Sequence, residues 1–152
     1  MKLGIISDTH GLLRPGAVAA LQGVDYILHS GDLGHISILH ELEKIAQVIA
    51  IRGNVDRSEA LMQLPATAIA ELEGTIFYLV HAREWLDLDP VSAGIQVVIY
   101  GHSHQPFSET RDGVLYLNPG SAGPRRFHLP ISLAILHIEG GEKRIEWVYL
   151  EE

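Results

Sequence analysis

Side chains that can bind a metal ion follow five short apolar runs of this sequence. The set comprises three oxygen donors and four imidazoles: Asp8, Asp32, Asn54, His10, His81, His102 and His104. In an open α/β sheet the ligand site lies beyond the carboxyl ends of the strands, so five such ends can converge. Histidine and carboxylate without thiolate suit Mn, Fe, Zn, Co or Ni better than Ca or Mg. Seven donors exceed what one zinc-like site needs and predict two ions that share a carboxylate.

Two pairs of these ligands, Asp8 with His10 and His102 with His104, are two residues apart. In extended backbone this spacing puts both side chains on one side, so each pair could bind one ion. Each motif alone is short and carries a high false-positive risk, and it is the order of all five that favours a site. A glycine precedes three of the ligands and permits the close backbone approach that such a strand end needs: Gly31, Gly53 and Gly101.

The elements that must position these side chains alternate in the first half of the chain. Apolar runs predict strands at 2–7, 26–30 and 48–51, and helical spacing predicts helices at 15–21 and 36–45. This order implies a parallel sheet with helices on its faces.

The second half is typical of strands joined by turns. Strands are predicted at 67–72, 75–80, 96–100, 114–117, 132–138 and 144–150. Asp89 and Pro90 predict the start of a short helix that ends near Gly94. From the pattern alone, a mixed sheet continues from the parallel part, within one domain that spans residues 1–152.

The composition excludes several classes of protein. Apolar residues make up 47% and charged residues 20%, which is ordinary for a soluble globular domain and rules out disorder. The 11 Lys and Arg against 19 Asp and Glu give a net charge of -8, which argues against broad nucleic-acid or anionic-membrane binding. Cysteine is absent, which excludes disulfides. With neither a signal peptide nor a long apolar run, the expected location is the cytoplasm.

Taken in order, the motifs resemble those of the calcineurin-like metallophosphoesterase superfamily. The matching segments are Asp8-Thr9-His10, Gly31-Asp32, Gly53-Asn54, His81 and Gly101-His102-Ser103-His104. The short length and the segments 53–56 and 118–121 are similar to the small prokaryotic phosphodiesterase branch. The resemblance implies an α/β (mixed α+β) fold, a four-layer αββα sandwich of two mixed β-sheets flanked by helices.

The resemblance also implies a dinuclear metal centre. Manganese is the first expectation for its metal, with nickel, iron, cobalt and zinc as alternatives. One ion would be held by Asp8, His10, Asp32 and His104. Asp32 would bridge to the second ion, which three further ligands complete: Asn54, His81 and His102. We therefore expect hydrolysis of small phosphodiesters by metal-bound hydroxide. The expected catalytic residues are Asp8, His10, Asp32 and Asn54.

The sequence departs from the superfamily pattern at two positions. Many relatives carry His directly after Gly-Asn, where it is thought to help protonate the leaving group, and here that position is Val55. We therefore expect diesters with good leaving groups to be preferred over alkyl phosphomonoesters. Relatives of the small branch often have Thr-His-Gly-His at the fourth strand end. This chain has Val80-His81-Ala82-Arg83, which removes the second His and any substrate contact that it makes.

Several other residues keep two interpretations. Asp56 orients a ligand or caps a helix, and residues 118–121 donate to phosphate or form a simple Pro-Gly turn. The arginines at 125–126 meet substrate phosphate or are a solvated pair. Trp85 and Trp147 are assigned to packing.

Two other functional classes stay open. One eukaryotic trafficking scaffold subunit has this fold with altered metal residues, whereas all seven ligand positions are intact here. The second class is a nuclease or a phosphomonoesterase, which the acidic balance and Val55 disfavour.

The resemblance implies a homo-oligomer. His29 is expected to buttress the second strand end.

Overall fold

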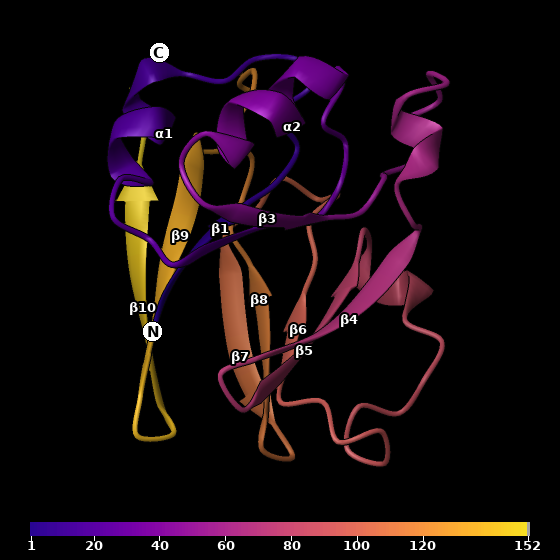
Figure 1. The fold of residues 1–152 in the computed structure, drawn as a ribbon, viewed down its shortest axis with the longest axis vertical. Coiled ribbons are helices and arrows are strands. Elements are labelled where there is room, and N and C mark those ends of the chain that lie inside the picture. The colour runs from indigo at the N-terminus through magenta and orange to yellow at the C-terminus, as the bar shows by residue number, and fades with distance from the viewer. Residues whose placement is uncertain (152) are drawn as a thin grey trace.

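The structure, a computed structural model, describes residues 1–151, which form two five-stranded β-sheets packed face to face (Figure 1). The first sheet contains β1 (Lys2–Ile6), β2 (Tyr26–His29), β3 (Gln47–Ala50), β9 (Ser132–Glu139) and β10 (Glu142–Tyr149). The second contains β4 (Thr67–Leu72), β5 (Thr75–Val80), β6 (Val97–Ile99), β7 (Phe107–Arg111) and β8 (Val114–Asn118). The strand orders are β10-β9-β1-β2-β3 and β4-β5-β6-β8-β7.

The sandwich interior is apolar because alternate residues of each strand face it. Leu3 and Ile5 of β1 are fully buried there, in one cluster with Phe77 and Leu79 of β5 and Ile99 of β6. Burying such large side chains stabilises the fold by about 1.5–3 kcal/mol each. The interior therefore fixes the two sheets, and with them the strand ends, relative to each other.

Helices α1 (Pro15–Ala20) and α2 (Ile36–Glu43) form the outer layer over the first sheet (Figure 1). Ala17 of α1 and Leu42 of α2 are buried against Ile6 and Ile27 of the sheet. His35 precedes α2 as its N-cap, and its ring nitrogen accepts the amide hydrogen of Ser37.

The outer layer over the second sheet is an irregular segment that contains the 3₁₀ helix η2 (Arg83–Trp85). Leu86 and Leu88 from this segment pack on Tyr78 and Val98 of the sheet. The prediction of a short helix after Asp89 is wrong, because residues 90–94 contain no α-helix.

Residues 90–94 instead form hydrogen-bonded turns. The Asp89 carboxylate accepts hydrogen bonds from the Val91 amide and the Ser92 hydroxyl. Asp89 therefore stabilises a turn and not the start of an α-helix.

The four-layer α/β architecture with two mixed sheets is confirmed, whereas the single continuing sheet is wrong. β9 and β10 return to the first sheet, where β9 pairs antiparallel with β1. Strand β7 was not predicted. Its sequence, Phe-Ser-Glu-Thr-Arg, lacks an apolar alternation because it is a largely solvent-exposed edge strand.

Parallel pairing sets where the polar strand ends lie. β1, β2 and β3 run parallel in the first sheet, and β5 and β6 run parallel in the second. Their carboxyl ends therefore lie along one edge within each sheet. Within residues 1–151, no helix combines the length and the apolar character that crossing a membrane requires.

Candidate metal centre

The carboxyl ends of β1, β2, β5 and β6 meet at one end of the sandwich. The amide of Asp8, after β1, donates a 3.0 Å hydrogen bond to the carbonyl of Gly31, after β2. The amide of Gly101, after β6, donates a 2.8 Å bond to the carbonyl of His81, after β5. Five of the seven predicted ligands converge here: Asp8, His10, Asp32, His81 and His104.

Each buried carboxylate uses one oxygen for local hydrogen bonds and turns the other toward imidazoles. Oδ2 of Asp8 accepts bonds from the Ser7 hydroxyl at 2.7 Å and from the His102 amide at 3.1 Å. Oδ1 of Asp8 lies 3.8 Å from Nε2 of His10, 3.8 Å from Nε2 of His81 and 3.4 Å from Nε2 of His104, and it accepts no hydrogen bond. The local bonds therefore orient Oδ1 into the centre.

Asp32 has the same arrangement. Its Oδ1 accepts the Val55 amide at 3.1 Å. Its Oδ2 lies 3.2 Å from Nε2 of His81 and 3.7 Å from Nε2 of His10. Both carboxylates thus lie between imidazoles, and the bridging role of Asp32 remains a prediction.

The tautomer of His81 is fixed by its backbone partner. Nδ1 of His81 lies 2.8 Å from the carbonyl oxygen of Ser30, which can only accept, so Nδ1 carries the hydrogen. In the neutral ring the lone pair of Nε2 then points toward the oxygens of Asp8 and Asp32. A lone pair facing two carboxylates is unfavourable unless a cation lies between them, and this is how metal-bound histidines are held.

Several polar atoms at the centre have no hydrogen-bond partner although they are buried. They are Oδ1 of Asp8, Nε2 of His10, Nε2 of His81 and Nδ1 of His104. Burying unpaired polar atoms costs about 1–3 kcal/mol each, which a bound cation would offset. Two sets of donor atoms lie within 4.8 Å of one another, Asp8 with His10 and His104, and Asp8 with Asp32 and His81. The donors therefore fit divalent metal ions.

The carboxylates are kept ionised, as ligands must be. Burial raises the pKa of Asp8, but the His104 ring and the charge of His81 lower it more, so it lies below its usual value. Burial likewise raises the pKa of Asp32, and His81 again outweighs that effect. Burial lowers the pKa of His81, but Asp32 and Asp8 raise it above its usual value. The excess negative charge therefore attracts either protons or metal ions.

The backbone at the centre is left-handed where the spacing argument assumed extended chain, so that assumption is wrong. Five predicted ligands have a positive φ: Asp8 at 54°, His10 at 47°, Asp32 at 57°, His102 at 72° and His104 at 63°. Non-glycine residues in this region cost about 1–3 kcal/mol and cluster at functional sites. The side chains of Asp8 and His10 still meet, because the turn directs both inward.

The glycines before the ligands allow close approach, as predicted. A Cβ on Gly53 would lie 2.1 Å from Oδ1 of Asp32, and one on Gly101 would lie 2.6 Å from Oδ2 of Asp8. No real side chain fits at either distance. Glycine at these positions therefore lets neighbouring loops contact the carboxylates.

The two remaining predicted ligands lie beside this group. The ring of His102 packs edge-on to that of His81, with centroids 5.1 Å apart, and is partly exposed. Asn54 is exposed on the loop whose next amide binds Asp32. Their roles as ligands remain predictions.

Two residues with open interpretations support the loops. Asp56 is 1% exposed and caps no helix, since its carboxylate accepts the amides of Leu33, Gly34 and Gly53. Asn118 is fully buried, and its amide nitrogen donates to the carbonyl of Gly101. Both stabilise loops that carry predicted ligands, and this role is visible only from their contacts in the structure.

His29 supports the second strand end as expected. Its Nδ1 accepts the amide hydrogen of Gly31, so its Nε2 carries the hydrogen that faces the Thr9 hydroxyl at 3.1 Å. Thr9 donates in turn to the carbonyl of Leu33. This buried chain links the ends of β1 and β2.

The packing role expected for Trp85 is wrong. The side chain is exposed by 48% and lies against the rings of His81 and His102. Trp147 does pack against the sandwich interior. Arg83 pairs with Glu109, so it does not replace the missing second His as a group facing the centre.

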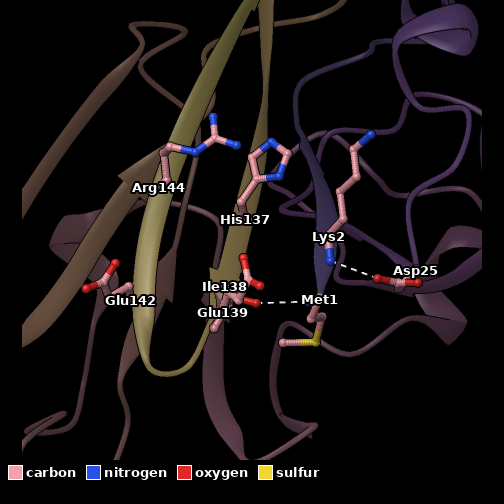
Figure 2. A pocket seen from close by; sticks show the side chains of 8 residues that line it. All are labelled: Met1, Lys2, Asp25, His137, Ile138, Glu139, Glu142 and Arg144. Atoms are coloured by element: carbon pink, nitrogen blue, oxygen red, sulfur yellow. Dashed lines mark hydrogen bonds between the residues drawn. The ribbon is translucent and has the colours of Figure 1, made fainter.

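A surface pocket lies at the start of β1, away from the carboxyl ends of the strands (Figure 2). Its lining mixes acidic and basic side chains and includes none of the predicted ligands: Met1, Lys2, Asp25, His137, Ile138, Glu139, Glu142 and Arg144. The candidate site is therefore defined by its donor atoms and not by this pocket.

Two proteins of known family are similar to this chain in sequence. A probable metallophosphoesterase of Methanothermobacter thermautotrophicus is 37% identical over 152 residues, covering 92% of this chain and 87% of that protein. A phosphodiesterase of Escherichia coli is 30% identical over 160 residues, covering 90% of this chain and 87% of that protein.

Solved structures of known proteins have the same fold as this chain. An archaeal phosphodiesterase superposes with a TM-score of 0.82 at 29% identity, over 97% of this chain and 100% of that one. Vps29 of Entamoeba histolytica, solved with zinc, superposes with a TM-score of 0.75 over 98% of this chain and 99% of that one. Its identity is 22%, so this likeness shows the fold alone. Residues 1–141 match the calcineurin-like phosphoesterase superfamily domain, and the chain therefore belongs to that superfamily.

Proposed function

We propose that this protein is a metal-dependent phosphodiesterase that hydrolyses small phosphodiesters at a dinuclear centre. The seven residues proposed to hold the two ions are Asp8, His10, Asp32, Asn54, His81, His102 and His104. Manganese is the proposed native metal, with nickel, iron, cobalt and zinc as the alternatives to test. The observation that carries this proposal is the group of unpaired buried atoms of Asp8, His10, His81 and His104 that face one another.

Divalent ions at this centre supply Lewis-acid stabilisation of the phosphoryl charge and activate water. The chain itself positions the proposed ligands. The Ser7 hydroxyl donates a hydrogen bond to Asp8, and the Val55 amide donates one to Asp32. The carbonyl of Ser30 holds the His81 ring. Ligands fixed before substrate arrives need no reorganisation during the reaction.

The leaving group receives little help from this site. The Val55 side chain, which follows Asn54, is 49% exposed and carries no proton to donate. A leaving group that departs as a weakly basic anion needs no such donor, whereas an alkoxide does. The proposed substrates are therefore diesters with good leaving groups, and alkyl phosphomonoesters are expected to turn over more slowly.

The test begins with metal-depleted protein, to which Mn, Ni, Co, Zn or Mg is added singly before assay with a panel of diesters. Bound metal per chain is measured on the same samples. His81→Ala should lose both metal and turnover. His137→Ala is the matched control, since His137 pairs with Glu146 on the partly exposed β9–β10 hairpin.

His81→Ala protein that retains its metal and its turnover would contradict the assignment of the site. Wild-type protein with neither bound metal nor diester turnover in added manganese would instead favour the scaffold class. Cleavage of single- or double-stranded DNA would favour a nuclease.

A further inference from the structure

Trp85 borders the candidate metal centre with nearly half of its surface open to solvent. Its ring centroid lies 5.2 Å from that of His102 and 5.9 Å from that of His81. It belongs to none of the apolar clusters formed by residues 1–151, although its neighbour Leu86 does. An exposed indole at the edge of a polar site offers a flat apolar surface to whatever binds there.

The indole is held by the segment that carries it. The Trp85 amide donates a 3.0 Å hydrogen bond to the carbonyl of Ala82, which is fully buried and directly follows His81. Two positions before Trp85, the Arg83 guanidinium lies 4.1 Å from the Tyr116 ring centroid. These contacts anchor η2 to the second sheet, so the backbone that carries the indole is held in place before any ligand binds.

Arg83 is paired on the second sheet, and the exposed Glu84 is anionic and would repel a phosphate, so the indole is the side chain of η2 that suits the organic group of a substrate. The Arg83 guanidinium is paired with Glu109 and stacked on Tyr116, and these contacts hold it on the second sheet. A phosphate ester held by the ligands would extend its organic group only a few bonds from His81 and His102, which Trp85 contacts.

We propose that Trp85 is a stacking platform for a flat aromatic ester group of the substrate, and this inference rests on the proposed function. The substrate class narrows to phosphoesters that carry either an aryl group or a nucleobase. Stacking on an aromatic side chain is tolerant of the ring's identity, because every such ring presents a π-face. Trp85 therefore acts as a specificity-determining residue and not as a catalytic one.

The test compares three phosphomonoesters that share the phosphate and differ in the attached group: phenyl phosphate, AMP and methyl phosphate. The metal-loaded Trp147→Phe protein has Trp85 as its only tryptophan, since the chain contains two. Quenching of its fluorescence reports contact with the indole directly. Calorimetry on Trp85→Leu and Trp85→Phe supplies the affinities where the fluorophore is absent.

Phenyl phosphate, AMP or both should quench Trp85 and bind about tenfold more tightly than methyl phosphate, the magnitude expected for one stacked ring. Trp85→Leu should remove this advantage without changing the affinity for methyl phosphate, and Trp85→Phe should restore most of it. Quenching by phenyl phosphate alone identifies an aryl ester, and quenching by AMP identifies a nucleotide.

Equal affinity for all three ligands, or an equal loss for all three in Trp85→Leu, would overturn the inference, because Trp85 would then only pack on the histidines. If all three ligands bind with equal affinity, methyl phosphate still binds and diesters still turn over, so the proposed function remains intact. Failure of all three ligands to bind, together with no diester turnover, would remove both proposals.

Discussion

Oδ2 of Asp56 accepts a hydrogen bond from the backbone amide of Gly53 at 2.8 Å. The same carboxylate accepts the amides of Leu33 and Gly34, the two residues after Asp32. One buried side chain thus joins the loop that follows β2 to the loop that follows β3. It fixes the predicted ligand Asp32 relative to the loop whose amide binds it.

We expect Asp56→Ala to weaken manganese binding and diester turnover by about 10- to 100-fold, as loss of groups that orient metal ligands does. The free energy of unfolding should fall by about 1–3 kcal/mol, because buried amides lose their acceptor. Titration calorimetry and a diester assay measure the first effect, and urea unfolding measures the second. Asp25→Ala is the control: Asp25 accepts the Lys2 amide away from the site, so turnover should not change.

Gly53→Ala should displace Asp32. The added Cβ would lie 2.1 Å from its Oδ1 and 2.5 Å from its backbone nitrogen, and neither atom can move without shifting this predicted ligand. A misplacement of about 1 Å costs roughly 10²-fold in rate, which sets the expected loss of diester turnover.

Gly16→Ala is the matched substitution in α1, where the nearest atom to the new Cβ is Cδ2 of Leu150 at 3.5 Å. It should leave turnover unchanged and raise the free energy of unfolding by up to about 1 kcal/mol. Similar kinetics for the two alanine variants would refute the role assigned to Gly53.

Acidification should destabilise the protein through His29. Burial lowers the pKa of His29 from 6.5 to about 4. At neutral pH the ring is uncharged in both states; below pH 6.5 the unfolded chain takes up a proton that the folded chain does not accept until about pH 4. The free energy of unfolding should therefore fall across this window, by about 3 kcal/mol in total.

Urea unfolding of metal-depleted wild-type and His29→Gln proteins across that pH window measures the effect. The other titrating side chains are common to both proteins, so the difference between the two curves isolates His29. The variant should lose less stability on acidification, and parallel curves would contradict the prediction.

Val55→His should introduce the missing proton donor. Val55 is half exposed beside Asn54, so a larger polar side chain can be accommodated. Turnover of diesters with alkyl leaving groups should rise by about tenfold or more, while turnover of nitrophenyl diesters should change little. Val55→Gln, which is polar but carries no acidic proton, should produce no such gain. An equal gain for both leaving groups would show that Val55 acts in some other way.

Much of the fold followed from local pattern. The runs at 67–72 and 75–80 are strands with the predicted bounds, and α1 ends one residue before its predicted end. The sequence pattern did not predict strand β7, because an exposed edge strand is held by backbone pairing with β8 and needs no apolar side chains. The division of the strands into two sheets could not be predicted from the pattern either, since strand periodicity does not say which strands pair. The family resemblance supplied the prediction of two sheets.

The sequence by itself determined which residue types could form a site, because ligand chemistry and order along the chain are local properties. Tertiary structure alone decided the contacts of Asp56 and Trp85, since these depend on packing between segments far apart in the chain. It also decided which predicted ligands face one another: Asp8 meets His104 at 3.4 Å across 96 positions of sequence because the two sheets pack face to face with the carboxyl ends of β1 and β6 at the same end of the sandwich. Such contacts arise from the folded core, and no spacing in the sequence encodes them.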